Sequence, residues 1–118
     1  MRESLSVFMV EGYGQTENNG GISGTFFSNY CVDDGSVGTV LPCGAIKLVD
    51  VEGTDYLARN NRGEIFYKGS NMMMGYFKNK EKTSETLDTD GWLETGDIGK
   101  HNNTVVTPNK ATKSFRVK

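Results

Sequence analysis

Short apolar runs separated by glycine-bearing turns recur along the chain, and this pattern constrains its fold more than any other feature. Three runs, 37–43, 45–51 and 64–68, have the length of strands, and polar turns with Gly53 and Gly63 lie between the last two. Short strands at such spacing form sandwiches or barrels. Fifteen glycines with only two prolines fit tight turns better than a low-complexity linker. The pattern therefore predicts an α+β, strand-dominated fold with a barrel-like subdomain.

One short helix interrupts the strands. It is expected over 79–87, with Thr83 as its N-cap.

Two further local features are expected in strands. The apolar run 5–10 predicts an interior strand covered on both faces. A bulge is expected between Leu48 and Val49, where the alternation of apolar and polar residues slips.

The stretches between these elements carry glycines and large apolar side chains. Residues 18–34 are rich in Gly, Asn and Ser and predict a long loop with limited pairing. The methionines 72–74 are expected to fill gaps in the core, and Tyr76 and Phe77 are expected to pack beside them.

Composition excludes several classes of protein. The formal net charge of −2 does not favour a nucleic-acid partner. Cys31 and Cys43 lack the neighbouring ligands of a zinc site, and we expect both to be reduced and partly buried. No secretory signal and no membrane-spanning run are recognisable, so the expected location is intracellular and cytoplasmic.

The segment 11–17, Glu-Gly-Tyr-Gly-Gln-Thr-Glu, concentrates groups that suit a nucleotide. The ring of Tyr13 can lie on a base, and Gly14 lets the backbone approach a ligand closely. Thr16 can donate to a phosphate, and Glu17 can ligate Mg²⁺, which prefers oxygen ligands. Taken alone, the residues fit a glycine-rich turn capped by Thr16 equally well.

Three motifs in order resemble those of the adenylate-forming enzymes, the superfamily of acyl-CoA synthetases, luciferases and adenylation domains of peptide synthetases. Residues 12–17 resemble Y-G-x-T-E, and residues 63–76 resemble G-E-[IL]…G…[MF]-x-G-Y. Residues 91–97, Gly-Trp-Leu-Glu-Thr-Gly-Asp, resemble G-W-x-x-T-G-D. The resemblance covers about residues 6–100. It implies a fragment of the large N-terminal AMP-binding domain of such an enzyme.

The details are most similar to the long-chain fatty acid–CoA ligases. Gln15 before the threonine, and the stretches 41–51 and 95–100, look like that branch. The resemblance implies that a fatty acid attacks Mg·ATP to give acyl-AMP, and that CoA then displaces AMP. The implied small-molecule substrates are ATP, a fatty acid and CoA, with Mg²⁺ as metal. Ligases for another carboxylic acid, such as an aryl acid or an amino acid, stay open as an alternative.

The resemblance also implies roles for individual residues. Thr16 and Glu17 would be catalytic, with Glu17 as the Mg²⁺ ligand and Thr16 on the phosphate of the adenylate. Asp97 would hold the ribose hydroxyls, although the residues alone favour a simple turn at 95–97. The implied nucleotide-binding residues are Tyr13 on the adenine, Gly14, Gln15, Thr16 and Asp97.

The similarity ends near Lys100. We expect residues 1–100 to form a partial AMP-binding domain and residues 101–118 to be a divergent basic tail without fixed order. The phosphate loop and the lysine of the C-terminal domain are expected outside this chain, so the isolated chain is expected to be inactive. A non-catalytic truncated product or nucleotide-binding fragment is the alternative. Family members often associate with membranes, which would place the parent enzyme at the endoplasmic reticulum.

Overall fold

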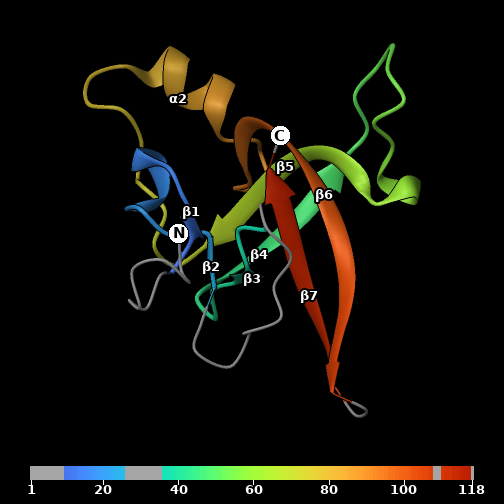
Figure 1. Ribbon diagram of the computed structural model, residues 1–118. Coiled ribbons are helices and arrows are strands. Elements are labelled where there is room, and N and C mark those ends of the chain that lie inside the picture. The colour runs from blue at the N-terminus through green and yellow to red at the C-terminus, as the bar shows by residue number, and fades with distance from the viewer. Residues whose placement is uncertain (1–9, 26–35, 108–109, 118) are drawn as a thin grey trace.

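The computed structural model describes residues 10–25, 36–107 and 110–117, and its strands form two antiparallel sheets (Figure 1). The smaller sheet has the order β1-β2-β3, with strands Gly12–Tyr13, Ser23–Gly24 and Thr39–Val40. The larger sheet has the order β4-β5-β6-β7, with strands Gly44–Val49, Arg62–Gly69, Leu93–Thr107 and Lys110–Val117. The strand-dominated α+β prediction is confirmed.

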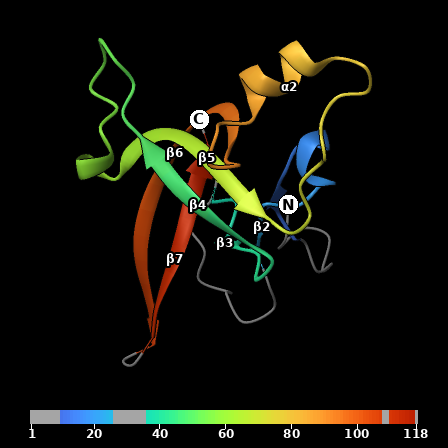
Figure 2. The same ribbon diagram turned by 180° about the vertical axis from the view of Figure 1, so that it is seen from behind.

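Pairing within the larger sheet follows the chain order from β4 to β7, as the view from behind shows (Figure 2). The β4–β5 register runs without a break up to Val49 opposite Glu64, so the bulge predicted between Leu48 and Val49 is wrong. Leu48 and Val49 are both half-buried, because both faces of this strand are partly covered. The irregularity lies instead on β5, between Glu64 and Phe66.

The core joins the two sheets. Ile22, which precedes β2, is fully buried with Tyr67 of β5 and Leu93 of β6. The partly buried side chains packed against these three are Tyr13, Ile46, Met72 and Leu87. Since Tyr13 belongs to the first motif and Leu93 begins the strand that carries the third, the core holds these motifs next to each other.

The helix α2 spans Lys80–Thr86, within the predicted range. Its N-cap is Asn79, whose Oδ1 accepts from the Lys82 backbone N at 3.0 Å, so the prediction of Thr83 is wrong. Thr83 lies inside the helix, and its hydroxyl donates to the Asn79 carbonyl at 2.8 Å and accepts from the Tyr76 N at 2.9 Å. An asparagine one turn earlier offered the same capping chemistry.

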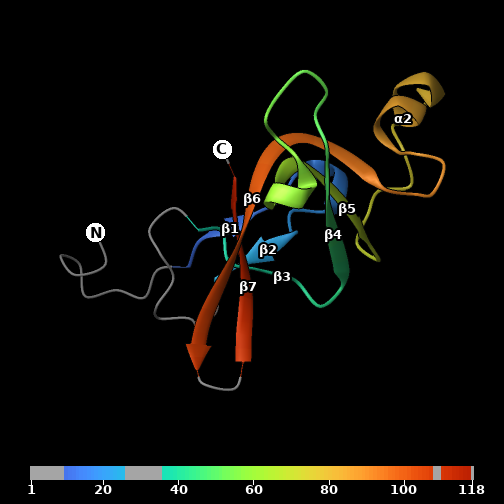
Figure 3. The same cartoon turned by 90° about the vertical axis from the view of Figure 1, so that its right-hand side faces the viewer.

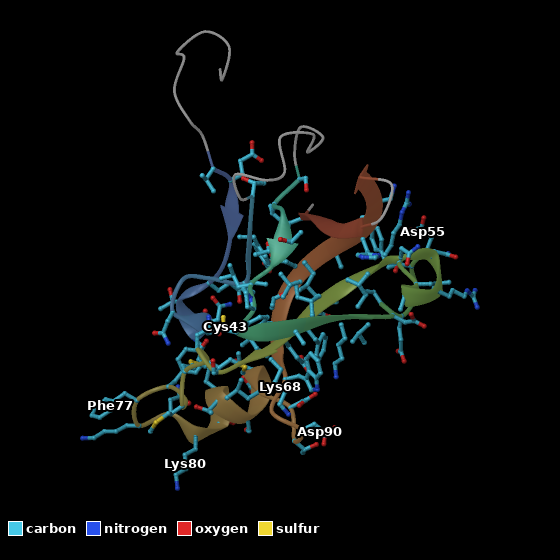
Figure 4. The ribbon with its side chains drawn as sticks, turned by 90° about the horizontal axis from the view of Figure 1, so that it is seen from below. Cys43, Asp55, Lys68, Phe77, Lys80 and Asp90 are labelled. Atoms are coloured by element: carbon cyan, nitrogen blue, oxygen red, sulfur yellow. The ribbon has the colours of Figure 1, made fainter. Side chains whose placement is uncertain are left out.

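Packing of the methionine segment is only partly as predicted. Met72 and Met73 are half-buried, but Met74 is 99% exposed and Phe77 is 86% exposed. Figure 4 shows Phe77 pointing away from the rest of the molecule.

Cys43 is a free, exposed thiol, so the expected partial burial is wrong for this residue. It directly precedes β4, at the surface end of that strand.

The segment after Lys100 continues β6 and returns as β7, with Gly99 opposite Val117 at the base of the hairpin. Figure 3 shows these strands side by side, extending away from α2. In the described residues after 100, β6 and β7 therefore pair with each other, whereas the proposed division at that residue stays a prediction. Residues 5–9 of the predicted interior strand, most of the loop 18–34 and Cys31 lie outside the described residues, and Val10, the last residue of that strand, is 56% exposed. In the described segments, no helix has the length and apolar character needed to cross a membrane.

Candidate functional site

The first and third motifs meet through a tyrosine–carboxylate hydrogen bond. Tyr13, at the end of β1, donates from its hydroxyl to Oδ2 of Asp97 at 2.7 Å, across 84 positions of sequence. Burial raises the pKa of the Tyr13 phenol well above its ordinary value. The hydroxyl therefore stays protonated at neutral pH and acts as the donor of this bond.

Gln15 makes a second link between the same segments. Its Nε2 donates to the Thr95 carbonyl oxygen at 2.8 Å and to Asp97 Oδ2 at 3.1 Å. The turn that presents Asp97 has Gly96 at its centre with a φ of +73°, a conformation that favours glycine. Thr95 supports the turn, because its hydroxyl donates to the Ile65 carbonyl at 2.7 Å and accepts from the Asp97 N at 3.2 Å.

Glu17 is held by the second motif. The Tyr76 hydroxyl donates to Glu17 Oε1 at 2.6 Å, and the Glu17 carbonyl accepts from the Met73 N at 2.7 Å. The bond from Tyr76 is the main cause of a lowered pKa at Glu17. The carboxylate is thus ionised near neutral pH. Sequence reasoning missed this role of Tyr76 and assigned the ring to packing; its place in a glycine–tyrosine motif was the only signal.

Gly14 serves the backbone of its own loop. A Cβ atom at this position would overlap the carbonyl group of Gly20, so the close approach is between two parts of the loop 14–20. The same loop is tied at its base by Asn18, which is fully buried and accepts from the Gln15 N at 3.0 Å. A requirement for glycine at position 14 therefore follows from the fold alone.

Two asparagines fix this loop, and the sequence analysis did not single out either of them. Asn71 donates from Nδ2 to the carbonyl oxygens of Asn18 and Gly21, each at 2.8 Å. Its Oδ1 accepts from the buried Tyr67 hydroxyl at 2.7 Å. Asn71 thereby anchors the motif loop to β5. Nothing in the local sequence distinguishes it from an ordinary turn asparagine.

An open cavity of about 490 Å³ adjoins these groups. Its lining residues are Gln15, Thr16, Glu17, Tyr76, Thr86, Glu94, Thr95 and Gly96. Thr16 is exposed there. Tyr13 and Asp97, which are hydrogen-bonded to each other, are not part of the lining. The structure thus brings all the sequence-predicted site residues into one region, with Gly14 as a backbone element.

The chemistry of the region is acidic and polar. Within the described residues, no three His, Cys, Asp or Glu side chains converge on one point as a protein metal cage. A single carboxylate such as Glu17 fits a magnesium ion that draws its other ligands from phosphate and water.

A second cavity of about 450 Å³ lies at Tyr56, Arg62 and Lys100 and contains none of the predicted site residues.

Comparisons with known proteins agree with the geometry. The family model described as "AMP-binding enzyme" matches residues 1–77. The chain is 48% identical over 100 residues to Long-chain-fatty-acid–CoA ligase 1 of Homo sapiens, with 85% of this chain covered. It is 44% identical over 91 residues, 77% of this chain, to Long-chain-fatty-acid–CoA ligase 1 of Saccharomyces cerevisiae. The matched stretches are 14% and 13% of the length of these two relatives.

Solved structures show the same fold. The crystal structure of ATP-bound MatB from Rhodopseudomonas palustris superposes with a TM-score of 0.67 at 31% identity, over 92% of this chain and 20% of the other. Mycobacterium tuberculosis fatty acyl CoA synthetase superposes with a TM-score of 0.72 at 24% identity, also over 92% of this chain and 20% of the other. The second similarity concerns the fold alone.

Proposed function

Since the chain belongs to the family of AMP-binding enzymes, we propose that residues 12–17 and 95–97 form the base and ribose side of the nucleotide site of a long-chain fatty acid–CoA ligase. The observation that carries this proposal is the junction of Tyr13, Gln15 and Asp97. A phenol, an amide and a carboxylate from two motifs about 80 positions apart are within hydrogen-bond distance. An aromatic ring beside a carboxylate offers a base platform and a diol acceptor together.

The proposed roles follow the chemistry of each group. Tyr13 lies against the adenine and Asp97 accepts from the ribose hydroxyls. Thr16, exposed in the cavity, donates to the phosphate of the acyl-adenylate. Glu17, whose pKa the hydrogen bond from Tyr76 lowers, is the carboxylate that holds Mg²⁺. The ion, when bound, offsets negative charge on the phosphates.

The proposed reaction has two stages. A fatty acid carboxylate displaces pyrophosphate from ATP and forms acyl-AMP, and the thiolate of CoA then displaces AMP and forms acyl-CoA. The described residues contribute binding and orientation, which account for a large part of catalysis in group transfer. Their contribution is to fix the nucleotide relative to the metal and the reacting phosphate.

A nucleotide-binding unit without turnover of its own is the second candidate. One observation favours it: the described lining of the cavity contains no Lys or Arg. Positive groups that stabilise the charge of a transferring phosphoryl group are a large contribution to such catalysis. The described residues alone would therefore bind a nucleotide without activating it.

Binding and turnover are tested separately. We expect hydrogen exchange of the 118-residue chain to show protection by Mg·ATP at 13–17 and at Asp97. A chain with protected sheet amides and no response to ATP at these positions would overturn the nucleotide assignment.

For turnover, residues 10–100 replace the matching stretch of the human ligase, and acyl-CoA formation is measured with a long-chain fatty acid. We expect activity in this hybrid and its loss in the Asp97→Asn hybrid. The control is Asp90→Asn, which alters an exposed carboxylate outside the site. A folded hybrid that binds ATP but forms no acyl-CoA would favour the second candidate.

A further inference from the structure

Both hydrogens of the Gln15 side-chain amide are committed within the protein. A glutamine NH₂ group carries two donor hydrogens. In the structure one goes to the Thr95 carbonyl at 2.8 Å and the other to Asp97 Oδ2 at 3.1 Å. Neither hydrogen is left for a ligand. Donation from this NH₂ group to a nucleotide would require breaking one of these bonds.

The same bonds divide the two oxygens of Asp97 into different roles. Oδ2 accepts from the Tyr13 hydroxyl and from Gln15 Nε2, which occupies both of its lone pairs. Within the described part of the chain, no donor reaches Oδ1. One oxygen is therefore saturated by the protein, and the other retains two lone pairs for a ligand.

The position of Gln15 is itself fixed from both ends. Its backbone N donates to Oδ1 of the fully buried Asn18 at 3.0 Å. At the other end, the amide donates to the Thr95 carbonyl. Thr95 is itself held in place, because its hydroxyl donates to the Ile65 carbonyl at 2.7 Å. An amide anchored this way helps to hold the carboxylate in one orientation, whereas an apolar side chain of the same length would leave Oδ2 with the bond from Tyr13 alone.

We propose that Gln15 is a positioning residue that orients Asp97 so that Oδ1 is left open to the hydroxyls of a vicinal diol, and that it thereby sets the selectivity of the site for ribonucleotides. The proposal rests on the proposed nucleotide function. It assigns Gln15 an indirect role through Asp97, in place of donation from its amide to the nucleotide.

The test compares ATP with 2′,3′-dideoxy-ATP, which lacks both hydroxyls, by equilibrium binding to the full chain in Mg²⁺. We expect the wild type to bind ATP at least about tenfold more tightly, since bonds to a charged group are among the stronger ones. In Gln15→Met, which keeps the length and removes both donors, ATP affinity should fall until the preference is within about threefold. Affinity for the dideoxynucleotide should stay nearly constant.

A purely structural role would weaken both nucleotides equally and leave their ratio unchanged. Gln15→Glu is the second variant; it keeps the shape but places a like charge beside Asp97, and the ratio should again collapse. The control is Thr54→Val, which should keep the wild-type ratio. It removes an exposed hydroxyl in another turn, where Thr54 donates to the Val51 carbonyl at 2.8 Å.

The outcomes separate the two proposals. A wild type that binds neither nucleotide overturns the proposed function, and this inference with it. A wild type that binds both equally overturns the role of Asp97 towards a diol. A wild type that prefers ATP, with the preference retained in a folded Gln15→Met or Gln15→Glu variant, overturns the role of Gln15 alone.

Discussion

The two carboxylates of the site are held in contrasting ways. Asp97 accepts two hydrogen bonds on one oxygen, one from the Tyr13 hydroxyl and one from the Gln15 amide. Burial raises the pKa of Tyr13. Glu17 accepts one bond from Tyr76, and it lines an open cavity. The segment that carries Tyr76 also includes Met74, which is 99% exposed, and Phe77, which is 86% exposed.

This difference fits what each carboxylate is proposed to bind. A ribose diol has fixed geometry, so a carboxylate oriented before binding avoids the entropy cost of ordering it later. Mg²⁺ requires an octahedral shell that includes water and phosphate oxygens, and a carboxylate with one side-chain hydrogen bond can adjust to that shell. The comparison predicts that changes around Asp97 affect binding more than changes around Glu17.

The largest effect is expected for Asp97→Asn. The substitution keeps the shape but removes the charge and puts an amide where donors from Tyr13 and Gln15 converge. We expect ATP affinity to fall roughly 100-fold, since two bonds to a charged acceptor are weakened. Equilibrium titration with ATP measures this, with Asp90→Asn as the control. A loss below threefold would contradict a binding role for Asp97.

A smaller effect is expected for Tyr13→Phe. The ring stays in the core contact with Ile22 and Tyr67, but the bond to Asp97 is lost. ATP affinity should fall about tenfold and the free energy of unfolding by about 1 kcal/mol. Titration and urea unfolding measure these quantities. Unchanged affinity, with the expected loss of stability, would show that the hydroxyl serves the fold alone.

Tyr76→Phe should act through the metal. Removal of the hydroxyl frees Glu17 Oε1 without changing the Asp97 side of the site. We expect the Mg²⁺ concentration for half-maximal ATP binding to rise about threefold, the effect of one partly solvated bond. Titration of Mg²⁺ at fixed ATP measures it, and Tyr56→Phe serves as the control. A change in the preference for ATP over its dideoxy analogue would contradict the separation of the two carboxylates.

The smallest effect is on stability against pH. The hydrogen bond from Tyr76 lowers the pKa of Glu17 from its ordinary value of 4.5. The bond therefore contributes to stability at pH values above 4.5, and this contribution is lost as pH falls through the lowered pKa. Wild type and Tyr76→Phe should therefore differ slightly in Tm at about pH 7, and the difference should be smaller at about pH 3. Thermal unfolding at both pH values checks this. A difference that grows in acid would reverse the sign and refute the assignment.

Local sequence was a good guide to the elements and to which motif residues lie together. The strands Gly44–Val49 and Arg62–Gly69 overlap the predicted runs 45–51 and 64–68, and the helix Lys80–Thr86 lies inside its predicted range. The motif order put Tyr13 and Asp97 in one site, and the structure joins them at 2.7 Å. These predictions succeeded because strand length, turn residues and motif spacing are properties of short stretches.

Contacts that join distant parts of the chain were missed, and some predictions about local packing and capping were wrong. Tyr76 lies 59 positions from Glu17, and Gln15 lies 82 positions from Asp97. The N-cap of α2 was misplaced by one turn because Asn79 and Thr83 both carry suitable oxygens. Met74 and Phe77 were expected inside, but the segment that carries them passes outside the core.

By itself, the sequence determined the class of fold, the family and which residue types gather in the motifs. The tertiary structure alone decided how the acceptors and donors are shared: Oδ2 of Asp97 is saturated by the protein, and Glu17 accepts its side-chain bond from Tyr76. The physical reason is that a hydrogen bond depends on distance and direction between two groups, which strand pairing and core packing set across the whole chain.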